Sequence, residues 1–298
     1  MNILIAGGTG FIGSALLTRL QSQGDRLFVL TRKDRKPSEN ITYIKWLSGD
    51  SNPEKNLPVI DAVINLSGES LNGGRWTKDQ KEKIITSRID SSREINRIIG
   101  SLKRRPSVLI NASAVGIYGT SLDKTFDEES PAFKEDFLSH TVRMWETEAG
   151  KAASSGTRVV LARFGVILGR SGGALPKMIL PYRLFAGGRI GSGRQWLSWI
   201  HIDDAVNAIL FALNSPEISG PVNITSPNPV RMDEFGKTAG AVLHRPHWLP
   251  VPSPILKLML GEMSMLVLKG QRAVPAKLAA NGFIYKHPGL SSALESLK

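Results

Sequence analysis

Three glycines spaced three residues apart stand near the start of the chain, between a short apolar run and an amphipathic one. Gly7, Gly10 and Gly13 come directly after the apolar residues 2–6. The run that follows carries apolar side chains at helical spacing: Phe11, Ile12, Ala15, Leu16 and Leu20. Glycine permits a tight strand-to-helix turn, and the helix then presents free N–H groups to an anion. The pattern predicts an α/β sheet whose first turn binds a diphosphate, and a glycine-rich turn without a ligand is the alternative.

The composition argues against several other classes of protein. The 298 residues are 41% hydrophobic and 21% charged, which is typical of a folded globular chain, and they include no cysteine. The sequence opens on an expected first strand rather than a signal peptide, and no apolar run has membrane-spanning length. We therefore expect a cytoplasmic protein with no disulfide, no metal site and no membrane association.

The formal net charge of +12 raises the question of nucleic-acid binding. The basic residues occur in short groups, such as 32–36 and 103–105, and singly along residues 165–195. They are not interleaved with aromatic residues that could stack on bases. This distribution favours small anionic ligands over nucleic acid.

The predicted second strand, residues 26–31, ends at a basic turn. In proteins that bind NAD, an acidic residue near this point accepts hydrogen bonds from the ribose 2′-hydroxyl. Here the corresponding positions hold Thr31, Arg32 and Lys33, and a guanidinium can bind a 2′-phosphate through two hydrogen bonds. The sequence therefore predicts NADP(H), with Arg32 as the main contact, unless residues 32–36 form only a solvated basic turn.

Further runs alternate between short apolar strands and long helices. Strands are expected over residues 61–66, 107–112, 158–163 and 221–224, and helices over 77–99, about 137–154, 203–213 and 232–243. Residues 165–195 are rich in glycine and isolated cations and are predicted as loops around a ligand. The order predicts a Rossmann-type doubly wound parallel α/β sheet over residues 1–164, with contributions from about 196–225. A smaller α/β substrate lobe is expected over 165–298, including a small C-terminal domain over about 244–298.

Several motifs resemble those of the extended and atypical short-chain dehydrogenase/reductases, the sugar-nucleotide epimerase superfamily. The residues that carry the resemblance are Gly7–Gly13, Asn65–Glu69, Ala112–Gly119, Trp145–Glu146 and Trp199–Asp204. They are most similar to the atypical branch described as epimerase family proteins, and the similarity covers nearly the whole chain. The resemblance and the glycine pattern together imply these cofactor contacts: Gly7, Thr9, Gly10, Phe11, Ile12, Gly13, Arg32, Leu66, Ser67, Gly68, Ala112, Arg163 and Phe164.

The catalytic residues of that superfamily are only partly matched. Its members use a Tyr-x-x-x-Lys pair, in which the lysine lowers the tyrosine pKa for proton exchange with the substrate. Aligning the helix on Glu146 places Leu138 and Val142 at these two positions, so this chain lacks the pair. By analogy Tyr118 and Ser113, which lies one residue from the usual serine position, are the catalytic candidates. The alternative for Tyr118 is an aromatic residue that packs beside the nicotinamide without transferring a proton.

Other polar residues are candidate substrate contacts or proton donors. The predicted substrate contacts are Glu69, Lys177, Arg189, Arg194 and His201. The arginines and Lys177 flank a glycine-rich irregular stretch that suggests an anion site, and Arg163 brackets the same region. Glu69, His201 and Asp204 are further candidates for an acid or base. Arg88, like Glu69, is a further candidate substrate contact, with a surface charge or half of an ion pair as the alternative for both. The alternative for His201 is a hydrogen-bonded structural role.

Two functions follow from these observations. The first is an NADP(H)-dependent oxidoreductase or epimerase with non-standard catalytic residues, acting on a small polar substrate that is anionic or resembles a sugar nucleotide. The second is a non-catalytic protein that binds or senses NADP(H). The expected partners are a small-molecule substrate and, by the resemblance, a second copy of the chain in a homodimer. Nucleic-acid binding ranks last among the functions considered.

Overall fold

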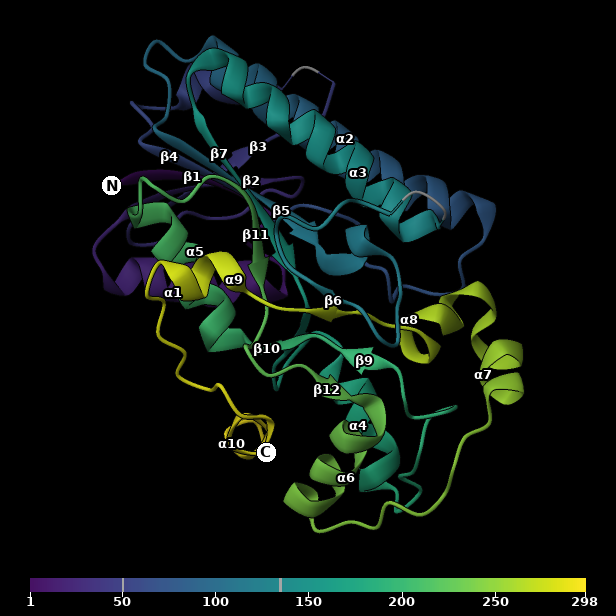
Figure 1. The fold of residues 1–298 in the computed structure, drawn as a ribbon. Helices are drawn as coiled ribbons and strands as arrows, with labels where there is room; N and C mark the ends of the chain where they lie inside the picture. The colour runs from purple at the N-terminus through teal and green to yellow at the C-terminus, as the bar shows by residue number, and fades with distance from the viewer. Residues whose placement is uncertain (50, 134–135) are drawn as a thin grey trace.

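The computed structural model describes residues 1–49, 51–133 and 136–298. Its largest element is a seven-stranded sheet in the order β11-β7-β5-β4-β1-β2-β3, in which every neighbouring pair is parallel (Figure 1). The strands are β1 (Asn2–Ala6), β2 (Arg26–Thr31), β3 (Ile41–Lys45), β4 (Ala62–Asn65), β5 (Val108–Ala114), β7 (Arg158–Phe164) and β11 (Gly220–Ile224). The predicted doubly wound parallel sheet is confirmed, and β3 is an edge strand that the sequence analysis did not assign.

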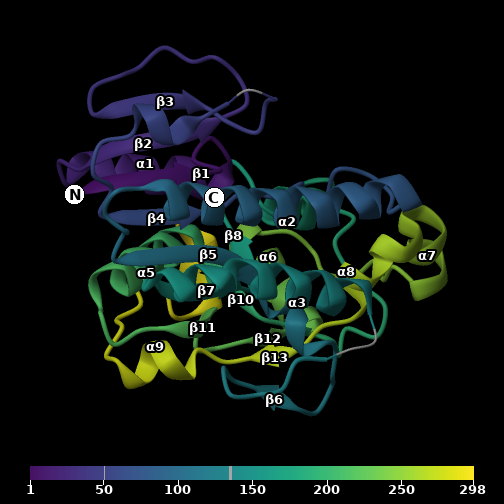
Figure 2. The same cartoon turned by 90° about the horizontal axis from the view of Figure 1, so that it is seen from above.

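Helices cover both faces of the sheet (Figures 1 and 2). On one face α1 (Phe11–Ser22) packs against α5 (Ile202–Asn214), and on the other α2 (Lys78–Ser101) packs against α3 (Phe137–Gly150). Successive side chains of a strand point to opposite faces, so Ile3 and Ile5 of β1 join the core under α1 and α5, whereas Leu4 joins the core under α2. The sheet is therefore buried on both sides, which explains the nearly continuous apolar runs of its strands.

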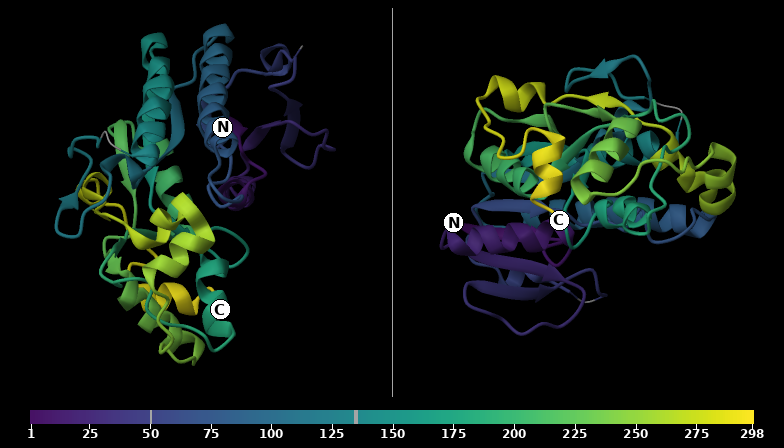
Figure 3. Two further views of the ribbon diagram at one scale, coloured as in Figure 1. Left: turned by 90° about the vertical axis from the view of Figure 1, so that its right-hand side faces the viewer. Right: turned by 90° about the horizontal axis from the view of Figure 1, so that it is seen from below.

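The later segments of the chain form a smaller part beside the sheet, and the left view of Figure 3 shows them in green and yellow below the long helices. Three short strand pairs belong to this region: β8 (Val166–Leu168) with β10 (Trp199–His201), β9 (Trp196–Leu197) with β12 (Val230–Arg231), and β13 (Arg272–Ala273) with β6 (Thr125–Phe126). Its helices are α4 (Leu175–Arg183), α6 (Met232–Leu243), α7 (Ser253–Leu260), α8 (Met265–Leu268) and α10 (Leu290–Glu295). The short α9 (Ala276–Ala280) instead packs against β11, with Leu278 in the core of the main sheet. Short 3-10 turns complete the fold: η1 (Pro53–Asn56), η2 (Val115–Tyr118), η3 (Lys151–Ser155) and η4 (Gly261–Ser264).

The prediction of loops throughout residues 165–195 is wrong for the short strand β8 and for α4. The glycines before this helix and the prolines within it obscure its helical pattern, since Pro176 lies at its start and Pro181 inside it. Proline is tolerated in the first turn of a helix, where its missing N–H has no partner to lose. Packing stabilises the helix further, because Leu175, Ile179 and Tyr182 are buried in the core of the smaller part.

The C-terminal segment is tied to α5 through a buried carboxylate. Asp204 has no exposed surface, and its two oxygens accept hydrogen bonds from the backbone N–H groups of Lys286 and His287 at 2.7 and 2.8 Å. The Lys286 ammonium also pairs with Asp203 at 2.9 Å. These contacts fix residues 286 and 287 against the start of α5 before the chain enters α10. None of the helices in the described ranges has both the length and the apolar character needed to cross a membrane.

Candidate functional site

The glycine turn between β1 and α1 has the geometry that its spacing predicts. Gly7 adopts a positive φ of +76°, and a Cβ atom there would lie 2.6 Å from the backbone carbonyl of Leu66. A Cβ atom on Gly13 would lie 2.2 Å from the Gly7 carbonyl oxygen. Gly10 is the N-cap of α1, and no side chain caps this helix in the described chain. The turn is thus a close-packed backbone surface at a helix N-terminus, which suits a diphosphate.

Phe11, predicted as a cofactor contact, packs into the segment that follows β8. Cβ atoms built on Gly169 and Gly172 would lie 2.4 and 2.5 Å from the Phe11 ring, and one on Gly173 would lie 2.8 Å from it. The ring therefore fills a space that only glycines leave open. The backbone N–H of Phe11 is the first of α1, and an N–H group in the first turn of a helix has no partner within that helix. Thr9 at the tip of the turn is exposed, and Ile12 is half-buried.

Arg32 lies exposed directly after β2, and its side chain has no hydrogen bond or ion pair in the described part of the chain. The buried Thr31 side chain shapes this turn by accepting a hydrogen bond from the Lys33 backbone N–H and donating one to the Lys33 carbonyl. The neighbouring Arg35 instead lies over the Tyr43 ring, 5.8 Å from its centroid. Arg32 is therefore free to bind a ligand at the end of β2.

Asn65 determines the shape of the loop after β4. Its side chain has no exposed surface, donates to the Asn111 side-chain oxygen at 2.7 Å and accepts from the Ser67 backbone N–H at 3.1 Å. The Glu69 backbone N–H donates to the Ser87 hydroxyl of α2 at 3.0 Å. The predicted cofactor contacts Leu66, Ser67 and Gly68 thus lie on a loop held at both ends. The sequence analysis missed the Asn65–Asn111 pair, although each amide interrupts or ends an apolar strand: Asn65 ends β4 and Asn111 lies inside β5. Such a polar residue in a buried run is a signal that could have identified them.

Tyr118 is buried in a hydrogen-bond network. Only 2% of the residue is exposed, its hydroxyl donates to the Asn223 side-chain oxygen at 2.7 Å, and it accepts from Arg163 Nη1 at 2.9 Å. Burial raises the pKa of Tyr118 to about 12, although Arg163 opposes the shift. Its ring also stacks on Phe126, with 5.4 Å between centroids. These contacts do not support proton transfer by Tyr118 and favour the packing role that the sequence left as the alternative.

Ser113 and Arg163 meet at Glu146 of α3. The Ser113 hydroxyl donates to Glu146 Oε1 at 2.5 Å, and Arg163 donates to both carboxylate oxygens at 2.8 and 2.9 Å. The two charged side chains are about 9 and 10% exposed. The Arg163 guanidinium is therefore committed to a buried ion pair and does not join the other predicted cations. Ala112 within β5 and Phe164 at the end of β7 are buried in the core shared with α1 and α5.

The predicted substrate cations lie apart from one another. Lys177 of α4 donates to the Asn72 carbonyl at 3.1 Å, which connects the smaller part of the chain to the loop after β4. Arg189 and Arg194 are exposed on the glycine-rich stretch, and the Arg194 carbonyl accepts a hydrogen bond from Arg231. Of these cations, only Lys177 is placed at the loop that carries Glu69.

His201, predicted as a substrate contact, makes the structural hydrogen bonds that the sequence offered as its alternative role. Its Nδ1 accepts the Asp203 backbone N–H at 3.0 Å and so caps α5, and its Nε2 faces the Ser296 hydroxyl at 3.1 Å. Burial, together with the nearby His287, lowers the pKa of His201 to about 4. The ring is therefore neutral at physiological pH, with its proton on Nε2.

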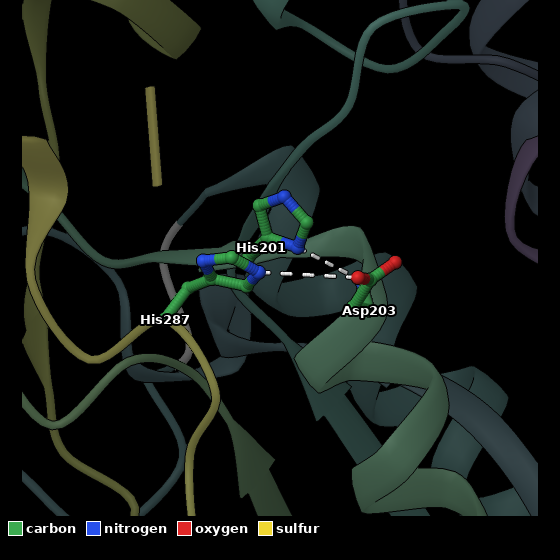
Figure 4. A group of neighbouring side chains, drawn as sticks. All are labelled: His201, Asp203 and His287. Carbon is green, nitrogen blue, oxygen red and sulfur yellow. Dashed lines mark hydrogen bonds and ion pairs between the residues drawn. The ribbon is translucent and has the colours of Figure 1, made fainter. Parts of the chain in front are cut away.

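His201, Asp203 and His287 form a cluster whose ligand atoms lie within 4.8 Å of one another, and Figure 4 shows both rings turned toward the carboxylate. The donor set does not fit a metal ion in this arrangement. The lone pair of His201 Nδ1 is used by the α5 cap, and Asp203 is already paired with Lys286. A cavity of about 490 Å³ adjoins the cluster, between α1 and the C-terminal segment, and no residue of the loop after β4 lines it.

The fold and the turn define a class of protein: a Rossmann-type α/β chain with a dinucleotide-binding strand, turn and helix. The model of the NAD dependent epimerase/dehydratase family matches residues 3–225, and a domain of unknown function (DUF1731) matches residues 251–297. The chain belongs to the NAD dependent epimerase/dehydratase family. The predicted resemblance is thereby confirmed, and so is a nicotinamide dinucleotide as the family's type of cofactor.

Relatives match over the full length of the chain. Epimerase family protein YfhF of Bacillus subtilis (strain 168) is 53% identical over 298 residues, which cover 100% of this chain and 98% of the relative. The human epimerase family protein SDR39U1 (isoform 2), crystallised with NADPH, is 33% identical with a TM-score of 0.88, covering 100% of this chain and 99% of that one. A nucleoside-diphosphate sugar epimerase from Corynebacterium glutamicum is 29% identical with a TM-score of 0.80, covering 100% of this chain and 58% of that one.

Proposed function

We propose that the chain binds NADP(H) in preference to NAD(H), at the ends of β1, β2 and β4. The observation that carries the proposal is the Arg32 guanidinium at the end of β2, which has no ion pair with any residue in the described ranges and stands where proteins that bind NAD have a carboxylate. Gly7 and Gly13 leave room for a diphosphate that a Cβ atom would fill. The human relative crystallised with NADPH supports the same choice.

The chain's own residues suit the orientation of such a cofactor. The N–H groups at the start of α1 would bind the diphosphate, and Arg32 would bind the 2′-phosphate through charge-assisted hydrogen bonds. Asn65 would hold the loop from Leu66 to Gly68 against the nicotinamide end. A bound nicotinamide supplies hydride transfer.

We infer that the reaction is an oxidation–reduction or epimerisation of a small polar, anionic substrate, with Glu69 moving the proton. Of the acid–base candidates, Tyr118, His201 and Asp204 are all engaged in hydrogen bonds inside the fold. The Glu69 side chain is half-buried and makes no hydrogen bond within the described ranges. It is therefore free to exchange a proton with a substrate.

The second candidate is a protein that binds or senses NADP(H) without turnover, and the buried, committed Tyr118 hydroxyl favours it. An assay of NADPH oxidation distinguishes the enzyme from the sensor. Small carbonyl compounds, carboxylic acids among them, are added in turn, and NADPH oxidation is followed by absorbance. Turnover that Glu69→Gln abolishes would support the enzyme. Absence of turnover across the panel, with NADPH binding intact, would favour the sensor.

Calorimetric titration tests the choice of cofactor. Wild-type protein should bind NADPH at least about tenfold more tightly than NADH, because hydrogen bonds to a charged group contribute about 1.5–3 kcal/mol. Arg32→Ala should remove most of that preference. Arg35→Ala is the matched control, since Arg35 lies on the Tyr43 ring, and it should keep the preference. An unchanged preference in Arg32→Ala would refute the proposal.

A further inference from the structure

Two consecutive residues of α3 each hold an arginine. Glu146 pairs with Arg163 of β7, and the Trp145 ring lies beneath Arg88 of α2, whose Cζ atom is 5.0 Å from the ring centroid. Trp145 is 5% exposed, so the indole is a fixed platform for the guanidinium. A cation over an indole face is attracted by the ring and held in a defined plane.

The two arginines differ in how their hydrogen bonds are satisfied. Arg163 donates from Nε and Nη2 to the Glu146 carboxylate and from Nη1 to Tyr118. Among the residues that the structure describes, Arg88 donates only from Nη1, to the Ile84 carbonyl of its own helix at 2.9 Å. No carboxylate of the described residues lies within ion-pair distance of Arg88. The edge formed by its Nε and Nη2 is thus unfilled, and the same edge of Arg163 shows that a carboxylate fits it.

The environment of Arg88 makes this unfilled edge costly. Burial lowers the pKa of Arg88 to about 10, and the nearby Glu69 carboxylate opposes the shift. The group is still charged at neutral pH, and a partly buried charge without a hydrogen-bonded counter-charge destabilises a fold. An anion from outside the chain would remove this penalty.

Arg88 lies against the loop after β4. A Cβ atom on Gly68 would stand 3.2 Å from Arg88 Cζ and 3.4 Å from Nη2, so the glycine allows the loop to pass close to the guanidinium. Gly68 is exposed, and Glu69 is the next residue along. Under the proposed function, this loop borders the nicotinamide. A group bound by Arg88 would therefore lie beside both the cofactor and the proposed proton-transfer residue.

We propose that Arg88 is a substrate-binding residue whose Nε–Nη2 edge receives a planar carboxylate of the substrate beside Gly68. This inference rests on the proposed function and adds the substrate class, a small carboxylic acid. The flat, two-pronged edge matches a carboxylate, as Glu146 does for Arg163. The Trp145 platform fixes the plane of the carboxylate and so orients the rest of the substrate.

The experiment titrates acetate, malonate and inorganic phosphate separately into the NADPH-loaded protein and follows the tryptophan fluorescence. Wild-type protein should give saturable binding of a carboxylate, and Arg88→Gln should weaken it by at least about tenfold. Arg88→Lys, which keeps the charge without the fork, should bind between the two. Arg97→Gln on the same helix is the control, since Arg97 is already paired with Glu54 and Glu94, and its carboxylate affinity should equal that of wild type.

Parallel NADPH titrations and melting temperatures keep the outcomes distinct. NADPH affinity within about twofold of wild type in Arg88→Gln, together with lost carboxylate binding, supports the inference. Equal carboxylate binding in wild type and Arg88→Gln, binding of phosphate alone, or loss of NADPH affinity in Arg88→Gln overturns it. If wild type binds no NADPH, the proposed function fails. The same carboxylate titration of the protein without cofactor then tests, independently of the cofactor, whether Arg88 binds a carboxylate.

Discussion

Replacing Glu146 by alanine would leave the Arg163 guanidinium buried without its counter-charge. The present pair makes two hydrogen bonds at 2.8 and 2.9 Å, and its side chains are about 9 and 10% exposed, so solvent cannot take over the role of the carboxylate. Breaking one half of a buried pair destabilises a protein by about 3–5 kcal/mol. Ser113 would lose its acceptor as well. We therefore expect the free energy of unfolding of Glu146→Ala to fall by at least about 3 kcal/mol.

Equilibrium urea unfolding, followed by circular dichroism, measures this change. Glu54→Ala is the matched control, since Glu54 pairs with the exposed Arg97 at 2.8 Å, and exposed pairs contribute less than about 1 kcal/mol. The double variant Glu146→Leu with Arg163→Met removes both charges and should be more stable than Glu146→Ala. A loss in Glu146→Ala no larger than that in Glu54→Ala would refute the reasoning.

Three further predictions concern single residues. Gly13→Ala places a methyl group 2.2 Å from the Gly7 carbonyl oxygen and should weaken NADPH binding by more than about tenfold, whereas unchanged calorimetric affinity would contradict the turn geometry. Gly100→Ala in α2 meets nothing within 4 Å and should raise the free energy of unfolding by about 0.5–1 kcal/mol, measured in urea. The pKa of His201 is about 4 in the folded protein, against an ordinary value of 6.5, so the unfolded chain binds a proton at this residue at a higher pH than the folded chain does. The free energy of unfolding should therefore fall as the pH drops from about 6.5 to about 4. His201→Asn keeps a capping side chain and should flatten that slope in melting temperature against pH, whereas His140→Asn on an exposed position should not.

The sequence predicted the parts of the fold that depend on local pattern. The glycine spacing located the turn, and the apolar runs located six strands of the main sheet. Each of these signals is formed by residues that are close together in the sequence. β3 was not assigned, since only two of its five residues are buried at the edge of the sheet. α4 was missed because its helical pattern is short and contains two prolines, and its burial against the core of the smaller part is a tertiary effect.

The site was less predictable, since the pairing of its polar groups is decided by packing. Arg163 and Glu146 are separated by 17 positions along the chain, on a strand and a helix, and nothing in the local sequence indicates that they meet. Tyr118 reaches Asn223 across more than a hundred positions. Such contacts decide which polar residues are occupied inside the fold and which, like Arg32 and Glu69, stay available for ligands.

The attachment of the C-terminal segment has a consequence for how that segment can change. Asp204 recognises residues 286 and 287 through their backbone N–H groups, which every amino acid except proline provides. This backbone part of the attachment therefore does not depend on which side chains stand at the two positions, whereas the ion pair between Lys286 and Asp203 does. A proline at either position would remove one of the two N–H donors to Asp204, a loss that no other residue type causes.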